Sequence, residues 1–128
     1  MDMNEDPNVG RGLRGERRAE RRFALDTSAV IHLVHGGSKL AGHMMNLSLG
    51  GCRIHTDERF LVGIYTRVEA EFSADGMAFR LGGVIQAIHE RQEVGVRFLD
   101  VSKRKREHLE QWMGEMEAIE AGRGGSQP

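Results

Sequence analysis

The chain has 128 residues, 39% hydrophobic and 29% charged, which suits one domain with a single core. Its net charge of −1 gives no general reason to expect a nucleic-acid partner, and its single cysteine, Cys52, excludes a disulfide within the chain. The first residues, MDMNEDPN, lack the basic and apolar regions of a secretory signal, and no apolar run is long enough to span a bilayer. We therefore expect a cytoplasmic protein without membrane insertion.

The N-terminal stretch is polar and strongly basic. Residues 1–16 show no periodicity, which predicts a disordered arm. Residues 11–22, RGLRGERRAERR, contain six arginines and two glutamates, so their local charge is +4. These arginines fit a solvated arm, or an arm that binds an acidic partner or nucleic acid. Nucleic acid is disfavoured because no aromatic residues that could stack on bases are interleaved with them.

From Phe23 onward, alternating apolar and polar residues predict a series of short strands. The segment SAVIHLVHGGSK indicates a hairpin, Asp75-Gly76 predicts a second tight turn, and Gly82-Gly83 predicts a bulge or bend. The alternation places one set of side chains inward: Cys52, Ile54, Val68, Ala70, Phe72, Val94, Val96 and Phe98.

After residue 100 the period of the apolar residues changes to that of a helix. Ser102 can cap its start, and residues 120–128 are expected to form a flexible tail. The apolar face of this helix consists of Leu109, Trp112, Met113, Met116 and Ile119. We predict a mainly β protein: a small antiparallel six-stranded β-barrel with a C-terminal α-helix and a flexible N-terminal arm. An open sandwich is the alternative.

One β-prone stretch, MMNLSLGGCRIHT at residues 44–56, contains Asn46 and Ser48 followed by Gly50 and Gly51. These residue types are typical of a β-turn, or of a bulge in a barrel. They also suit a site where a ligand must approach the backbone, because glycine has no side chain to obstruct it. The stretch alone favours the turn.

The arginines before the first strand, taken together with this stretch, resemble the motifs of the PilZ domain family, which are bacterial receptors for cyclic di-GMP. The family patterns are R-x-x-x-R and [D/N]-x-S-x-x-G, which match Arg18 with Arg22 and Asn46-Leu-Ser48-Leu-Gly-Gly51. Arg17 with Arg21 also fits the first pattern, but Arg22 directly precedes the strand that begins at Phe23. The resemblance implies that residues 17–119 form a PilZ-like split barrel.

The resemblance also implies a ligand-binding site, and its chemistry is plausible for these residues. Guanidinium groups bind phosphate or the Hoogsteen edge of guanine, and an asparagine amide can meet a guanine edge with a donor and an acceptor. Arg21, Arg53 and Arg97 are further candidates. The residues expected to bind cyclic di-GMP are Arg17, Arg18, Arg22, Asn46, Ser48, Gly50 and Gly51.

The implied function is that of a receptor whose arm is ordered by the ligand and then presents a new surface to a downstream protein. Arg17, just before the first motif, is associated in the family with an intercalated ligand pair, which predicts two molecules per chain. A PilZ-fold interaction module without nucleotide, or less favourably a small-barrel nucleic-acid-binding protein, remains open. The sequence contains no phosphate loop, no nucleophile elbow and no metal-ligand spacing, so we expect neither an enzyme nor a cofactor.

Overall fold

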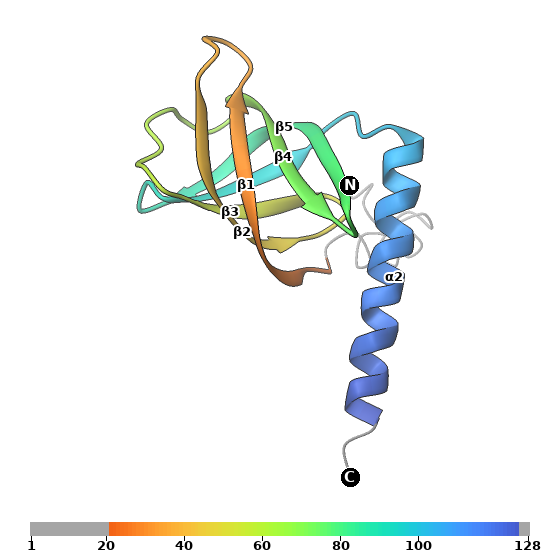
Figure 1. Ribbon diagram of the computed structural model, residues 1–128. Coiled ribbons are helices and arrows are strands. Elements are labelled where there is room, and N and C mark those ends of the chain that lie inside the picture. The colour runs from red at the N-terminus through yellow and green to blue at the C-terminus, as the bar shows by residue number, and fades with distance from the viewer. Residues whose placement is uncertain (1–20, 126–128) are drawn as a thin grey trace, which may run out of the picture.

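A computed structural model of the chain describes residues 21–125, with side chains described up to residue 120. Six antiparallel strands close into a barrel, and one helix lies beside it (Figure 1). The predicted barrel and C-terminal helix are confirmed, and the open sandwich is excluded. The expected arm at residues 1–16 lies outside the described residues. The elements are β1 (Phe23–Leu33), β2 (Lys39–Leu47), β3 (Gly51–Thr56), β4 (Arg67–Ala74), β5 (Met77–His89), β6 (Glu93–Phe98) and α2 (Lys103–Gly125).

The barrel closes in the order β1-β2-β3-β6-β5-β4, and β4 pairs back onto β1. The two predicted hairpins are confirmed. In the turn between β4 and β5, Asp75 (φ 55°) and Gly76 (φ 70°) both adopt the left-handed conformation that a tight two-residue hairpin requires. These local turns bring sequence neighbours together, whereas the pairing of β3 with β6 joins segments about 40 residues apart.

The barrel interior is filled by the side chains that the alternation predicts. All eight of the residues expected to face inward are buried. Phe72 stacks on Phe79 with ring centroids 5.5 Å apart. Cys52 lies in this core, where burial raises the pKa of its thiol to about 12, against a smaller opposing effect of the charge on Arg22. The thiol therefore stays protonated and serves as a small core residue.

The sequence predicts a bulge or bend at Gly82-Gly83, and the bulge is not found at these residues. The register between β4 and β5 runs unbroken through both glycines, and the shift in β5 falls between Ile85 and Ala87, against β6. Gly83 has a different role. A Cβ atom there would lie 2.3 Å from the carbonyl oxygen of Arg97, so the glycine allows β6 to approach β5 closely.

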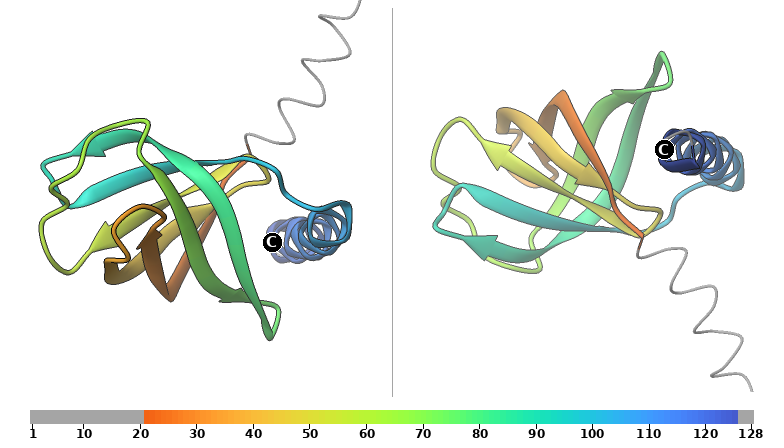
Figure 2. Two further views of the ribbon diagram at one scale, coloured as in Figure 1. Left: turned by 90° about the horizontal axis from the view of Figure 1, so that it is seen from above. Right: turned by 90° about the horizontal axis from the view of Figure 1, so that it is seen from below.

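Helix α2 covers the β5 side of the barrel, as the end-on views show (Figure 2). Leu109 and Met113 are buried against the core, and Trp112 and Met116 are partly buried. The predicted cap is present, because the Lys105 backbone N–H donates to Ser102 Oγ at 3.2 Å. The helix continues to Gly125, past residue 120 where the sequence suggests a tail, and its distal half extends beyond the barrel (Figure 1). No helix within residues 21–125 is long and apolar enough to cross a membrane.

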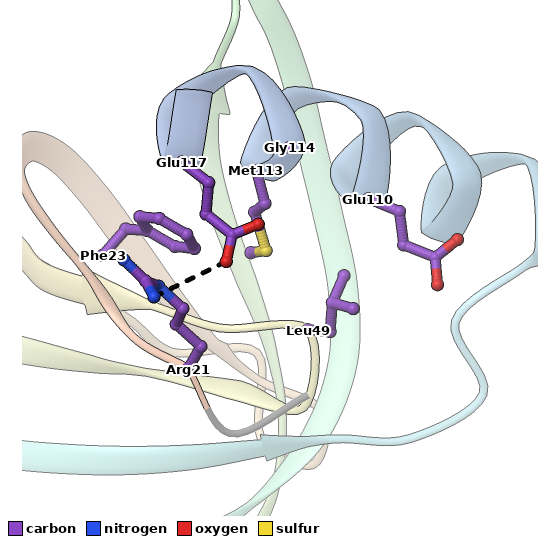
Figure 3. Close-up of a pocket in the computed structure, with 7 residues that line it drawn as sticks. All are labelled: Arg21, Phe23, Leu49, Glu110, Met113, Gly114 and Glu117. Carbon is purple, nitrogen blue, oxygen red and sulfur yellow. Dashed lines mark ion pairs between the residues drawn. The ribbon is translucent and has the colours of Figure 1, made fainter. Parts of the chain in front are cut away.

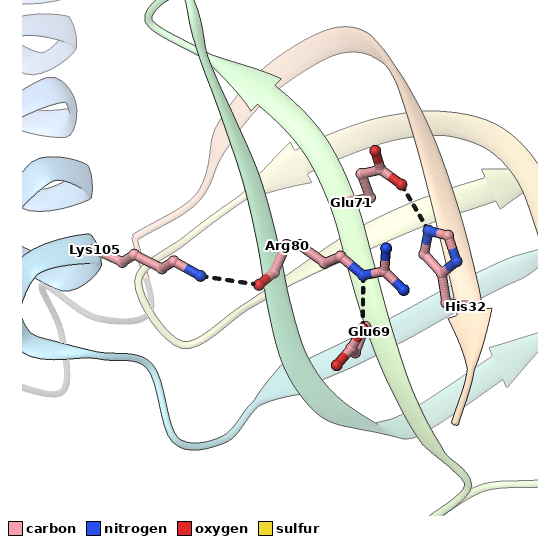
Figure 4. A network of polar contacts seen from close by, with 5 residues as sticks. All are labelled: His32, Glu69, Glu71, Arg80 and Lys105. Atoms are coloured by element: carbon pink, nitrogen blue, oxygen red, sulfur yellow. Dashed lines mark hydrogen bonds and ion pairs between the residues drawn. The ribbon is translucent and has the colours of Figure 1, made fainter. Parts of the chain in front are cut away.

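Charged side chains cover the outer face of β1, β4 and β5 (Figure 4). His32 Nε2 lies 2.6 Å from Glu71 Oε1, and Arg80 Nε donates to Glu69 Oε1 at 2.6 Å. Lys105 Nζ donates to the Arg80 carbonyl at 3.3 Å and so ties the first turn of α2 to β5. The Arg80–Glu69 pair is exposed and His32 is partly buried, and surface ion pairs of this kind contribute little to stability individually.

Candidate functional site

The two motifs singled out in the sequence meet where β1 begins and β2 ends. Ala24 of β1 pairs with Asn46 of β2, so the residues just before β1 lie beside the last residues of β2. Arg22 Nη1 donates to Asn46 Oδ1 at 2.7 Å. Among residues 21–120, Arg22 has this neutral amide as its side-chain partner and no carboxylate. Its positive charge is therefore exposed and not neutralised within the described part of the chain.

The turn between β2 and β3 is closed by the side chain of Ser48. Ser48 is buried, with 2% of its surface exposed. Its hydroxyl accepts from the Gly51 backbone N–H at 3.1 Å and lies 3.2 Å from the Gly51 carbonyl, to which it can donate. The Ser48 backbone N–H donates to the same carbonyl at 2.8 Å. The serine therefore shapes the turn that follows Asn46, and its hydroxyl is hydrogen-bonded within that turn.

Gly51 and Gly50 fit this turn against β6. A Cβ atom on Gly51 would lie 2.1 Å from the carbonyl oxygen of Val96, closer than real Cβ contacts come. The barrel itself thus requires glycine at this position, independently of any ligand. The Gly50 carbonyl accepts from the Phe98 backbone N–H at 2.8 Å, which fastens the exposed tip of the turn to the end of β6.

Arg53 and Arg97 share the outer face with Asn46. Arg53 pairs with Asn46 on one side and with Gly95 on the other, while Arg97 is opposite Gly51. Both arginine side chains are exposed, and Arg53 has one distant carboxylate neighbour, Glu93, at 3.9 Å. Gly95, opposite Arg53 and two residues before Arg97, has no side chain that could project between the two arginines. The candidate residues of β2, β3 and β6 therefore form one continuous surface.

Arg21, unlike Arg22, contacts helix α2 (Figure 3). Its Nη2 donates to Glu120 Oε1 at 2.7 Å, its Nη1 lies 3.5 Å from Glu117 Oε2, and its guanidinium carbon is 5.1 Å from the centre of the Phe23 ring. A cavity of about 90 Å³ lies between the helix and the start of β1. It has room for a few water molecules but not for a dinucleotide. The side chains around it come from Arg21, Phe23, Leu49, Glu110, Met113, Gly114 and Glu117.

Glu117 and Glu120 are absent from the residues proposed on sequence alone. The sequence does contain a sign of this pairing, since two glutamates three residues apart lie on one face of a helix and the N-terminal stretch is basic. Nothing in the sequence showed that this helix face would reach the arm. Arg17 and Arg18 lie outside the described residues. Within the described part of the chain, no three His, Cys, Asp or Glu side chains gather where they could hold a metal ion.

Comparison with known proteins identifies the family and the fold. A PilZ domain family model matches residues 16–115, and comparison with curated proteins finds no match. The crystal structure of YcgR from Escherichia coli in complex with c-di-GMP superimposes with a TM-score of 0.70 at 20% identity, covering 88% of this chain and 51% of that one. This chain thus spans about half the length of that YcgR chain.

Two further solved structures have the same fold. One is the PilZ domain of CeSA from a cellulose-synthesizing bacterium (TM-score 0.61, 15% identity, 76% of this chain and 99% of that one). The other is the inhibitor of motility MotI/DgrA from Bacillus subtilis (TM-score 0.61, 9% identity, 77% and 49%). Identities this low support the fold alone, but the family model covers most of the chain, including both motifs and all six strands. The chain therefore belongs to the PilZ domain family.

Proposed function

We propose that this chain is a receptor for cyclic di-GMP. The observation that carries the proposal is the contact between Arg22 and Asn46, at 2.7 Å, which joins the two motifs on one outer surface of the barrel. Membership of the PilZ family supports it, as does the resemblance to a structure of YcgR in complex with c-di-GMP.

The proposed site matches the chemistry of this ligand, which carries two phosphates and two guanines. Arg22 offers a guanidinium whose charge is not neutralised by a described carboxylate, and such a group binds phosphate or a guanine edge bidentately. Asn46 supplies an amide donor and acceptor beside it. Arg53 and Arg97 extend the positive surface along β3 and β6. In this proposal Ser48 and Gly51 act by holding the turn, and Gly50 leaves its exposed tip open.

The proposed response is ordering of the arm over the barrel. Arg17 and Arg18 would close on the bound ligand, and the arm, ligand and barrel together would form a new surface for a downstream protein. The domain that responds comprises residues 17–119. We also propose two ligand molecules per chain, since an intercalated pair brings four negative charges and Arg17 supplies an additional cation next to Arg18.

Calorimetric titration of the full chain with cyclic di-GMP, GTP and single-stranded DNA tests the proposal. We expect binding of cyclic di-GMP alone, an endpoint near two equivalents, and a tenfold or greater loss of affinity for Arg22→Ala. Arg59→Ala is the matched control, because Arg59 is equally exposed but follows the opposite end of β3. An endpoint at one equivalent contradicts only the pairing. Binding of DNA alone favours the nucleic-acid alternative, and binding of none of the three favours an interaction module.

A further inference from the structure

Two consecutive arginines at the start of β1 have opposite partners. Arg22 contacts Asn46 on the outer face of the barrel, whereas Arg21 contacts Glu117 and Glu120 on helix α2. The two side chains thus leave the same short segment toward different partners, one on the barrel and one on the helix. This short segment therefore links the proposed ligand surface to the helix.

The charges of the two arginines are used differently. The Arg21 guanidinium faces two carboxylates and the ring of Phe23, while that of Arg22 faces an uncharged amide. An anionic ligand can recruit Arg22 without breaking any ion pair to a described residue. Recruiting Arg21 would break two ion pairs and a cation–π contact. The geometry therefore assigns Arg22 to the ligand and Arg21 to the protein.

We propose that Arg21 is a positioning residue. Arg21 and Arg22 form the base of the arm, and the contact of Arg21 with Glu117 and Glu120 fixes this base to helix α2 and holds Arg22 at Asn46. This inference rests on the proposed function, and it names the part of the fold that holds the ligand-binding arginine. It also selects the Arg18 and Arg22 register over Arg17 and Arg21.

The contact also anchors the distal half of the helix. Leu109 and Met113 hold the first half against the core, and Ile119, further along, is 51% exposed. Glu117 and Glu120, one turn apart, lie beyond the last buried apolar side chain of the helix. Together with the partly buried Met116, Arg21 thus links the barrel to the part of α2 that extends past it (Figures 1 and 3).

The expected effects are modest because the three charged side chains are each about half exposed, at 45–48%. Exposed ion pairs and cation–π contacts of this kind change an equilibrium by about two- to fivefold. Removing Arg21, or both glutamates, should therefore weaken cyclic di-GMP binding by about two- to fivefold. Loss of Arg22, which we place in the site, should weaken it at least tenfold.

Amide hydrogen exchange of the ligand-free chain tests the anchor without reference to any ligand. Arg21→Ala should speed exchange at residues 114–120 and at the start of β1, and the pair Glu117→Gln, Glu120→Gln should do the same. Glu115→Gln is the matched control, because it removes an exposed charge from the same helix, at a position away from Arg21. Exchange unchanged from the unmodified chain in both variants would overturn the anchor.

Titration with cyclic di-GMP tests positioning. The Arg21→Ala variant and the double glutamine variant should each lower affinity, and combining them should add nothing, because they remove one interaction. Arg21→Glu should bind weakly, and adding Glu120→Arg should restore affinity by rebuilding the pair in reverse.

A different result would show that Arg21 itself binds the ligand. In that case the double glutamine variant would free Arg21 and raise affinity above that of Glu115→Gln, and the reversed pair would not restore binding. Failure of the unmodified chain to bind cyclic di-GMP would instead overturn the proposed function. The exchange measurements would then still decide whether Arg21 anchors the helix.

Discussion

The turn between β2 and β3 and the base of the arm each contain residues of one of the two sequence motifs, yet they are built in opposite ways. In the turn, Ser48 is buried, its hydroxyl is hydrogen-bonded to Gly51, and Gly51 is pressed against a neighbouring carbonyl. At the base of the arm, Arg21 and Arg22 are exposed, and the contacts recorded for them with other described residues are made by their side chains. The comparison teaches that the turn supplies residues that fix a shape, whereas the base of the arm supplies charge. Stability and binding should therefore separate on substitution.

The largest expected effect is on folding, from Gly51→Ala. The new Cβ would lie 2.1 Å from the Val96 carbonyl oxygen, so β3 and β6 would have to move apart. We expect a loss of about 3 kcal/mol or more in the free energy of unfolding, measured with urea. Gly63→Ala is the control, because no atom lies within 4 Å of its added Cβ. Equal stability of the two variants would show that the strands accommodate a side chain at Gly51.

At the base of the arm, Arg22→Ala should have the opposite profile. Its side chain is exposed and makes one hydrogen bond to the described residues, so the free energy of unfolding should change by less than about 0.5 kcal/mol. Binding of cyclic di-GMP should weaken by about 1.5–3 kcal/mol, the range for a hydrogen bond to a charged group. Urea unfolding and calorimetry on the same preparation compare the two. A variant that is destabilised but binds cyclic di-GMP normally would show that Arg22 supports the fold and does not contact the ligand.

Ser48→Ala should resemble the glycine substitution on a smaller scale. It leaves the Gly51 backbone N–H without its acceptor in a buried turn, at a cost of about 1–3 kcal/mol in the free energy of unfolding. Affinity should fall less than for Arg22→Ala, since the hydroxyl is engaged within the turn. Ser102→Ala, at the start of α2, is a control that loses an exposed cap. Binding lost with stability retained would show that Ser48 contacts the ligand directly.

Sequence reasoning succeeded where the signal is local. The alternation at Val68, Ala70 and Phe72 identified a strand and its buried face, because the side-chain period of a strand depends on neighbours two residues apart. Asp75-Gly76 marked its turn for the same kind of reason, since the left-handed backbone restricts which residues fit.

The features that sequence reasoning missed depend on contacts between distant segments. Gly51 is tight only because β6 closes the barrel beside it, 45 residues later, which no local pattern around the glycine reveals. The sequence places a bulge or bend at Gly82-Gly83, whereas the structure has its register shift between Ile85 and Ala87. The pairing with β6, not the glycine content, determines where an extra residue is accommodated. The pairing of Arg21 with Glu120 joins the two ends of the domain. The site could thus be proposed from its motifs, but the division of roles within it could not.

The smallest expected effect lies away from both regions, at Glu71 on the outer face of β4. The hydrogen bond to His32 is the main cause that lowers the pKa of this carboxyl (Figure 4). A smaller desolvation effect opposes it, and the charges of His32, Arg80 and Lys39 add to it. Because the pKa is lower in the folded chain than in the unfolded one, the folded state binds fewer protons. The pair therefore contributes stability above the ordinary glutamate range, and this is lost as the pH falls through the folded pKa.

Glu71→Gln should therefore lessen the decrease in urea midpoint between pH 6 and pH 3, and His32→Ala should do so equally, with no further change when the two are combined. Both variants should bind cyclic di-GMP normally at pH 7, because the pair is on β1 and β4, away from Arg22 and Asn46. An unchanged pH dependence would mean that the pair does not persist in solution. Weakened binding of cyclic di-GMP would mean that the residues that affect binding extend to β1 and β4, beyond the turn and the base of the arm.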